Sequence, residues 1–134
     1  MIMLNNTEVR DVIILFLKHH HELTKPDDTG YLVNSLFRQK TGKIAIDDDL
    51  TIWNDMQRSL QLVKKTNDLL TEEEAFEVMI NFLEKYFMRT NSDDIRSVLG
   101  DLLHDTYGVT SDPGAWYDWQ DCLMKVKATV NNKN

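Results

Sequence analysis

The chain contains two similar segments, and the first of them reads WNDMQRSLQLVK at residues 53–64. The second segment lies 63 positions later and reads WYDWQDCLMKVK at residues 116–127. Six of the twelve aligned positions are identical, and Asp49 and Asp112 each stand four residues before the tryptophan. Their apolar residues recur every three or four positions, which is the spacing of one helix face. The sequence therefore predicts two copies of one helical packing unit.

The same offset extends upstream into apolar positions. It aligns Ile13 with Phe76, Phe16 with Met79, Leu17 with Ile80, Leu32 with Ile95, and Leu36 with Leu99. We predict an all-α fold: a six-helix bundle built from two pseudo-repeated three-helix units, in a single domain over residues 1–134. Repeat one covers about 7–66 and repeat two about 70–130. The two long apolar helices, first and fourth, are expected to pack together at the centre.

Capping signals and breaks place the six helices. The expected starts, in chain order, are Thr7, the residue after Thr29, Asp48 or Asp49, the capping box Thr71–Glu74, Asn91 or Ser92, and Asp112–Pro113. Apolar periodicity predicts that the first helix runs to about His21. It also predicts that four further side chains face the core: Phe37, Leu50, Trp53 and Trp116. No strand is expected.

Charge is distributed unequally along the chain. The net charge is −7, but residues 1–66 carry nine basic and nine acidic side chains, whereas residues 67–134 carry six and thirteen. Nucleic-acid binding is disfavoured because phosphate contacts need a basic footprint. A single cysteine and the lack of a long apolar run favour a cytoplasmic protein without a membrane segment or signal peptide.

Three features suggest catalysis or metal binding, and each has a structural alternative. His19, His20 and His21 are consecutive on a helix and point about 100° apart, so they do not share one metal ion. Asp101 and His104 have the spacing of an acid–base pair, but they also suit a helix end. Cys122 aligns with Ser59, between core positions, where a buried small apolar residue is expected, and no histidine or positive helix end is visible beside it. We therefore expect no enzyme activity, cofactor or metal.

The remaining candidate site is acidic and aromatic. Its predicted partner-binding residues are Asp93, Asp94, Asp101, Asp105, Tyr107 and Tyr117. Carboxylates of like charge give no internal stabilisation, so their accumulation in one half suggests an external cationic partner. The alternative interpretation is that these aspartates only cap helices and keep the protein soluble.

The second half also resembles a known family. The resemblance lies in five motifs: LTEEEAF at 70–76, FLEKY at 82–86, TNSDDI at 90–95, LGDL at 99–102 and DPGAW at 112–116. They look like small helical immunity proteins of bacterial contact-dependent growth inhibition and related polymorphic toxin systems. The resemblance covers roughly residues 70–127. It implies a short, acidic, cytoplasmic protein that neutralises a cognate toxin domain, often a nuclease.

Two other functions stay open at this point. A helical adaptor or regulatory subunit would bind a partner peptide or helix in an apolar groove between the copies. A small hydrolase would use Asp101 and His104. The oligomeric state, the toxin and its reaction do not follow from the sequence.

Overall fold

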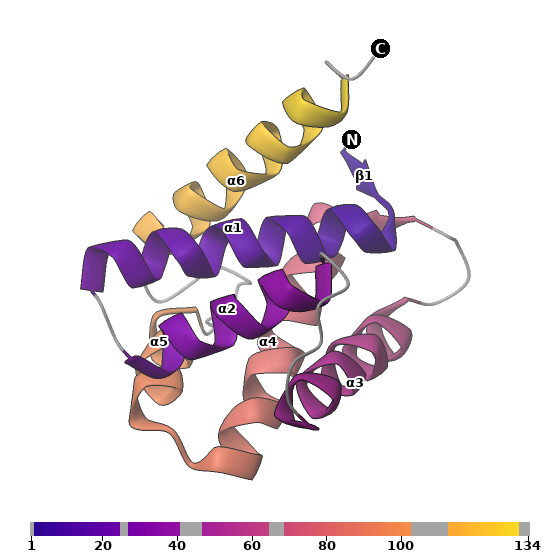
Figure 1. The fold of residues 1–134 in the computed structure, drawn as a ribbon. Coiled ribbons are helices and arrows are strands. Elements are labelled where there is room, and N and C mark those ends of the chain that lie inside the picture. Colours follow the sequence, from indigo (N-terminus) through magenta and orange to yellow (C-terminus); the bar gives the residue numbers. More distant parts are fainter. Residues whose placement is uncertain (1, 25–26, 41–46, 65–68, 103–112, 132–134) are drawn as a thin grey trace.

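The computed structural model describes residues 2–24, 27–40, 47–64, 69–102 and 113–131 (Figure 1). Within these ranges six helices pack together, as predicted. In chain order the elements are β1 (Met3–Leu4), α1 (Asn6–Thr24), α2 (Asp27–Lys40), α3 (Asp47–Val63), β2 (Leu70–Thr71), α4 (Glu72–Thr90), α5 (Asp93–Leu102) and α6 (Pro113–Asn131). Among the helices of these ranges, none is long and apolar enough to cross a membrane.

Two of the helices begin with the same reciprocal cap. At α4, the Glu74 N–H donates to Thr71 Oγ1 (3.1 Å) and the Thr71 N–H donates to Glu74 Oε1 (2.8 Å), which confirms the predicted capping box. At α1, the Glu8 N–H donates to Asn5 Oδ1 (2.8 Å) and the Asn5 N–H donates to Glu8 Oε1 (2.9 Å). Each cap satisfies amides that have no partner inside the helix.

A two-residue ribbon joins the starts of these two helices. β1 and β2 pair antiparallel, with Met3 opposite Thr71 and Leu4 opposite Leu70. Leu4 and Leu70 are both fully buried. The expectation of no strand was wrong, because two residues are too few to produce a readable apolar alternation.

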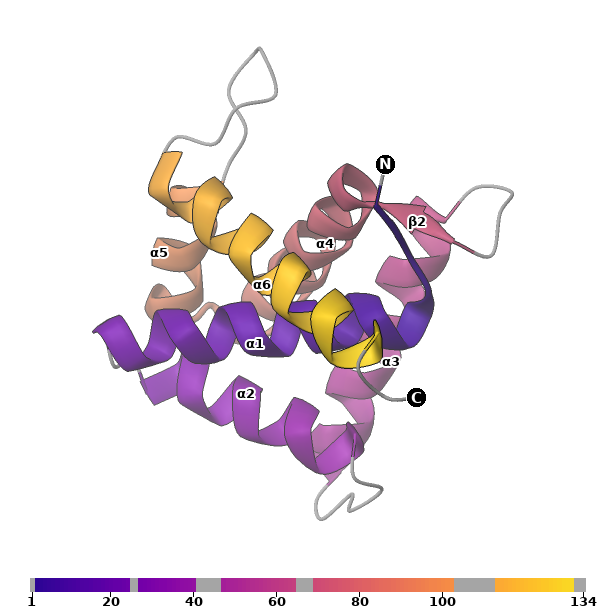
Figure 2. The same cartoon turned by 90° about the horizontal axis from the view of Figure 1, so that it is seen from above.

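The helices are not centred on an α1–α4 pair. Among the described residues, α1 packs most closely on α2 and α6, and α4 packs on α3 and α5. Figure 2 shows α6 crossing over α1. The expected central pairing is therefore wrong. One cause is Trp119 of α6, whose buried ring lies 5.9 Å from Phe16 of α1 and 5.3 Å from Phe76 of α4.

The core is apolar and continuous, but four predicted core residues lie at its edge or outside it. Phe37 is 56% exposed and Leu50 is 52% exposed. Phe37 follows buried Leu36, and a step of one residue turns a side chain about 100° around the helix. Trp53 and Trp116 are half-buried. Trp116 packs against the core through Phe76, whereas Trp53 is covered by Arg10.

An ion pair ties the first helix to the last. Lys127 Nζ lies 2.9 Å from Glu8 Oε2, and the Glu8 side chain is only 8% exposed. Burial raises the pKa of Glu8, but the Asn5 amide and the Lys127 ammonium outweigh it and hold the pKa below the ordinary 4.5. A carboxyl with a lowered pKa stabilises the fold above its ordinary pKa. That stabilisation is lost as the pH falls through the lowered value.

We predict that Glu8→Gln lowers the free energy of unfolding at pH 7 by about 1–2 kcal/mol, because a charge-assisted contact is lost while an amide still caps the helix. Urea denaturation measured from pH 7 downward checks this. The difference from the wild type should narrow as the pH falls below 4.5.

Glu74→Gln is the matched control. Glu74 makes the same kind of cap as Glu8, but no lysine or arginine of the described residues forms an ion pair with it. Its effect should be smaller than that of Glu8→Gln at pH 7. Equal effects of the two substitutions would show that the Lys127 contact adds no stability.

Candidate functional site

The α4 helix carries a row of carboxylates that the sequence interpretation missed. Glu73, Glu77 and Glu84 are exposed and stand four and seven residues apart, so they share one helix face. Met88 continues the row and is 83% exposed. The spacing was readable from the sequence, but the three glutamates at residues 72–74 had been interpreted only as a helix start.

A tight turn then places two of the predicted aspartates beyond this row. Asn91 ends α4 in the left-handed conformation (φ 56°), and its N–H donates to the Phe87 carbonyl. Ser92 follows and accepts a hydrogen bond from the Ile95 N–H at 3.3 Å. Asp93 is exposed and Asp94 half-buried in the first turn of α5. Both carboxylates therefore lie at the positive end of that helix.

The other four predicted site residues are placed less completely. Asp101 lies on α5, seven residues after Asp94. Asp105 and Tyr107 lie outside the described residues. Tyr117 stands on α6, which contacts α5, and is 65% exposed. We call Glu73, Glu77, Glu84, Asp93 and Asp94 the acidic surface.

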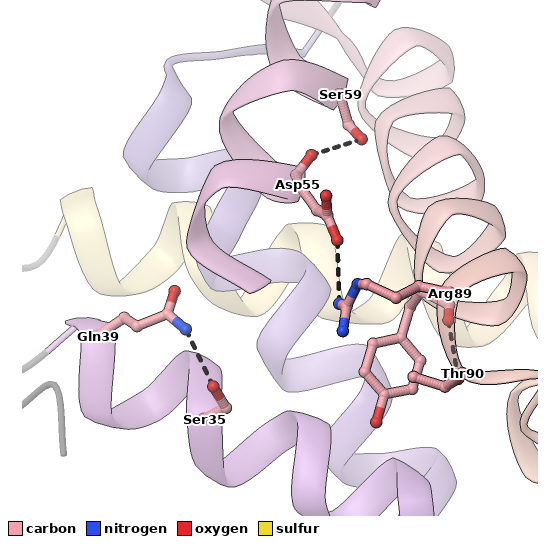
Figure 3. A network of polar contacts seen from close by, with 7 residues as sticks. Ser35, Gln39, Asp55, Ser59, Arg89 and Thr90 are labelled. Carbon is pink, nitrogen blue, oxygen red and sulfur yellow. Dashed lines mark hydrogen bonds and ion pairs between the residues drawn. The ribbon is translucent and has the colours of Figure 1, made fainter. Parts of the chain in front are cut away.

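Two cations of the second half are engaged by carboxylates of the first half. Arg89 of α4 lies 3.1 Å from Asp55 of α3 (Figure 3). Its guanidinium also lies over the Tyr86 ring. Lys127 of α6 is held by Glu8 of α1, as described above. These contacts direct positive charge toward the first half.

A separate cavity of about 220 Å³ opens between α1 and α6. It is lined by Leu15, Lys18, His19, Asp118, Asp121, Cys122 and Lys125. His19 Nε2 lies 4.0 Å from Asp118 Oδ2. The sequence interpretation found no histidine near Cys122, and this was wrong, because α1 and α6 are far apart in the sequence and cross in space.

The cysteine in this cavity is not activated. Burial raises the pKa of the Cys122 thiol to about 11; Lys125 opposes this rise, and Asp118 and Asp121 add to it. The side chain is 4% exposed, as its predicted core role requires. Because the thiolate is the nucleophile, a thiol that is protonated at neutral pH is poorly suited to covalent catalysis.

The three consecutive histidines point in separate directions, as predicted. His19 faces Asp118, the His20 ring lies 6.5 Å from that of Phe16, and the His21 ring packs over Gly30. A Cβ atom at Gly30 would lie 2.7 Å from the His21 ring, so a larger residue at this position would displace the ring. Among the described residues, no three His, Cys, Asp or Glu side chains are grouped to hold a metal ion. His104 lies outside those residues.

Comparisons of this chain with protein-family models, with curated proteins and with solved structures found no match.

Proposed function

We propose that the protein is a non-enzymatic immunity protein that binds and neutralises a cognate bacterial toxin domain, a nuclease with a basic active site. The acidic surface, with Asp101, Asp105, Tyr107 and Tyr117, forms the contact. The observation that carries the proposal is the row of exposed carboxylates on α4, together with Asp93 and Asp94 in the first turn of α5.

The mechanism is electrostatic and steric. Carboxylates on a rigid helix occupy the positions where a nuclease holds substrate phosphates, and the bulk of the bundle blocks access. Complementary charge also accelerates the encounter of the two proteins. Exposed Tyr117 and Met88 supply apolar contacts, which charge alone lacks.

The internal repeat belongs to the same proposal. An offset of 66 residues aligns the two ribbon–cap segments, Leu4–Glu8 with Leu70–Glu74. It also aligns pairs that are buried in both halves: Val9 with Ala75, Val12 with Val78, Ile13 with Met79, Phe16 with Phe82, Leu17 with Leu83, Leu32 with Val98, and Leu36 with Leu102. The offset of 63 residues, which aligns Trp53 with Trp116, then applies only to α3 and α6. We infer that the halves derive from one duplicated unit.

The packing order supports the duplication. Suppose that helices α1, α2 and α3 correspond to α4, α5 and α6. The contact of α3 with α4 then corresponds to that of α6 with α1, and the contact of α1 with α2 corresponds to that of α4 with α5. All four contacts are present. In the same correspondence, Arg10 stands over Trp53 (4.4 Å) where Phe76 stacks on Trp116 (5.3 Å, 21°).

We predict that Arg10→Phe keeps the fold and raises the free energy of unfolding by about 0.5–1 kcal/mol, because the new ring stacks on Trp53 as Phe76 does on Trp116. Urea denaturation checks the change. A loss of more than about 1 kcal/mol would show that the two sites are not equivalent.

We predict that Cys122 in the folded protein reacts with iodoacetamide at pH 7.5 at least tenfold more slowly than a free thiol, because its raised pKa and burial leave little exposed thiolate. Mass spectrometry over time measures the rate, and the urea-unfolded chain is the control. Rapid alkylation of the folded protein would favour an enzyme that uses the cavity with His19.

We predict that coexpression of this chain protects cells from the toxin domain encoded beside its gene and not from unrelated toxin domains. The two purified proteins should form a complex whose affinity falls with salt. Growth in the presence of the induced toxin and isothermal calorimetry measure the two effects. Growth arrest despite normal expression of this chain would remove the immunity function.

Matched charge variants locate the contact. Glu77→Gln with Glu84→Gln, and separately Asp101→Asn with Asp105→Asn, each change the net charge by two and should weaken binding at least tenfold. Thr51→Lys with Gln61→Lys makes the same change at exposed positions of α3 and should leave affinity within twofold. Unchanged affinity in both test variants would exclude Glu77, Glu84, Asp101 and Asp105 as contact residues.

A further inference from the structure

A second cavity lies between α1, α2 and α3, on helices other than those of the acidic surface. Its volume is about 170 Å³. The lining residues are Thr7, Arg10, Asp11, Ile14, Leu36, Gln39 and Trp53. Ile14 and Leu36 form a buried apolar wall. Arg10 contributes a guanidinium and Gln39 a carboxamide.

The Arg10 guanidinium is only partly satisfied. Its central carbon lies 4.4 Å from the centroid of the Trp53 ring, so one face is covered by the indole. Within the described part of the chain, its hydrogen bond goes to Thr7 Oγ1 at 3.4 Å, and no carboxylate forms an ion pair with it. An arginine has five N–H donors in a planar fork. As far as the described residues are concerned, most of this donor capacity remains available to a ligand.

Burial makes this incomplete pairing costly. Burial lowers the pKa of Arg10, and nearby Asp11 counteracts this only in part. A half-buried guanidinium is stabilised most effectively by a carboxylate in a bidentate contact. The indole beneath the guanidinium fixes its plane, so the fork is oriented before a ligand arrives.

The rest of the cavity limits the shape of such a ligand. Ile14 and Leu36 are buried and offer apolar contact. Gln39 is 8% exposed, and its Nε2 donates to Ser35 Oγ at 3.0 Å, which holds the carboxamide in place (Figure 3). Asp11 on the same wall repels a second negative charge. The cavity therefore favours a single carboxylate on a short apolar stem.

We propose that this cavity is a binding site for a monocarboxylate, whose oxygens pair with the Arg10 guanidinium and whose stem lies against Trp53, Ile14 and Leu36. The second half supports the assignment, because Phe76 takes the place of Arg10 and covers Trp116 with a ring. This site goes beyond the proposed toxin contact and does not depend on it. A carboxylate reaches it either as a free small acid or as a group on a protein partner.

Butyrate is the first probe, with butyramide as its uncharged match. In ¹H–¹⁵N spectra, butyrate should shift the Trp53 indole and Arg10 Nε signals in a saturable way. Butyramide should shift them at least tenfold less at equal concentration. The Trp53 signal is identified by its loss in Trp53→Phe. Equal shifts from the two probes, or no saturation with butyrate, would overturn the proposal.

Arg10→Gln tests the guanidinium directly and should weaken butyrate binding at least tenfold. Arg58→Gln removes an exposed arginine from α3 and should leave binding unchanged. An undisturbed spectrum away from the cavity shows that each variant is folded. Full binding by folded Arg10→Gln would also overturn the proposal.

A tripeptide, acetyl-Ala-Ala-Ala with a free carboxyl terminus, distinguishes the two sources of the carboxylate, with its amidated form as the control. If the acid peptide binds as well as butyrate, the site is assigned to a carboxylate on a protein partner. Binding of butyrate alone assigns it to a free small acid. Toxin protection measured in Arg10→Gln cells separates this site from the acidic surface, since that function should persist.

Discussion

The burial of Trp119 is the constraint on which the packing of the bundle depends. Its ring contacts Phe16 edge-on and Phe76 face-on, so one side chain from α6 joins α1 and α4. Burying such a ring removes about 150–250 Å² from water, worth roughly 4–6 kcal/mol. Its indole N–H finds no acceptor among the described residues, which costs about 1–3 kcal/mol. The apolar gain outweighs this cost, and the helices therefore arrange themselves around the ring.

The sequence predicted the order of the helices because their signals are local. The Thr71–Glu74 cap, the Asn91–Ser92 boundary and Pro113 at the start of α6 all depend on neighbours within four residues. The Asn5–Glu8 cap carries the same signal and was missed beside a less acidic first turn. Contacts between distant segments were not predictable in this way. The pairing of β1 with β2 and the insertion of Trp119 depend on which helices meet.

The candidate site was predictable only in part for the same reason. Asp93 and Asp94 were visible as the first turn of a helix, and the exposure of Tyr117 agrees with a surface role. The shared face of Glu77 and Glu84 is readable from their spacing, but in the sequence analysis the acidic residues of this helix are interpreted only as a helix start. The position of His19 and Cys122 at one cavity depends on the crossing of α1 and α6. The sequence shows which residues share a face of one helix, but it does not show which helices contact one another.

The proposed duplication gives a physical reason for the difference between the halves. Two copies of one unit can share a core, since the buried positions of α1 and α4 agree, while their surfaces change independently. Two ion pairs between the halves join a cation of the second half to a carboxylate of the first half. Arg89 and Lys127 neutralise Asp55 and Glu8, so the second half is left with surplus carboxylates.

In the proposed correspondence, Arg10 covers Trp53 where Phe76 covers Trp116. A ring at this position would add packing, so a half-buried cation costs stability that a ligand could restore. Such a residue is more readily explained by binding than by folding.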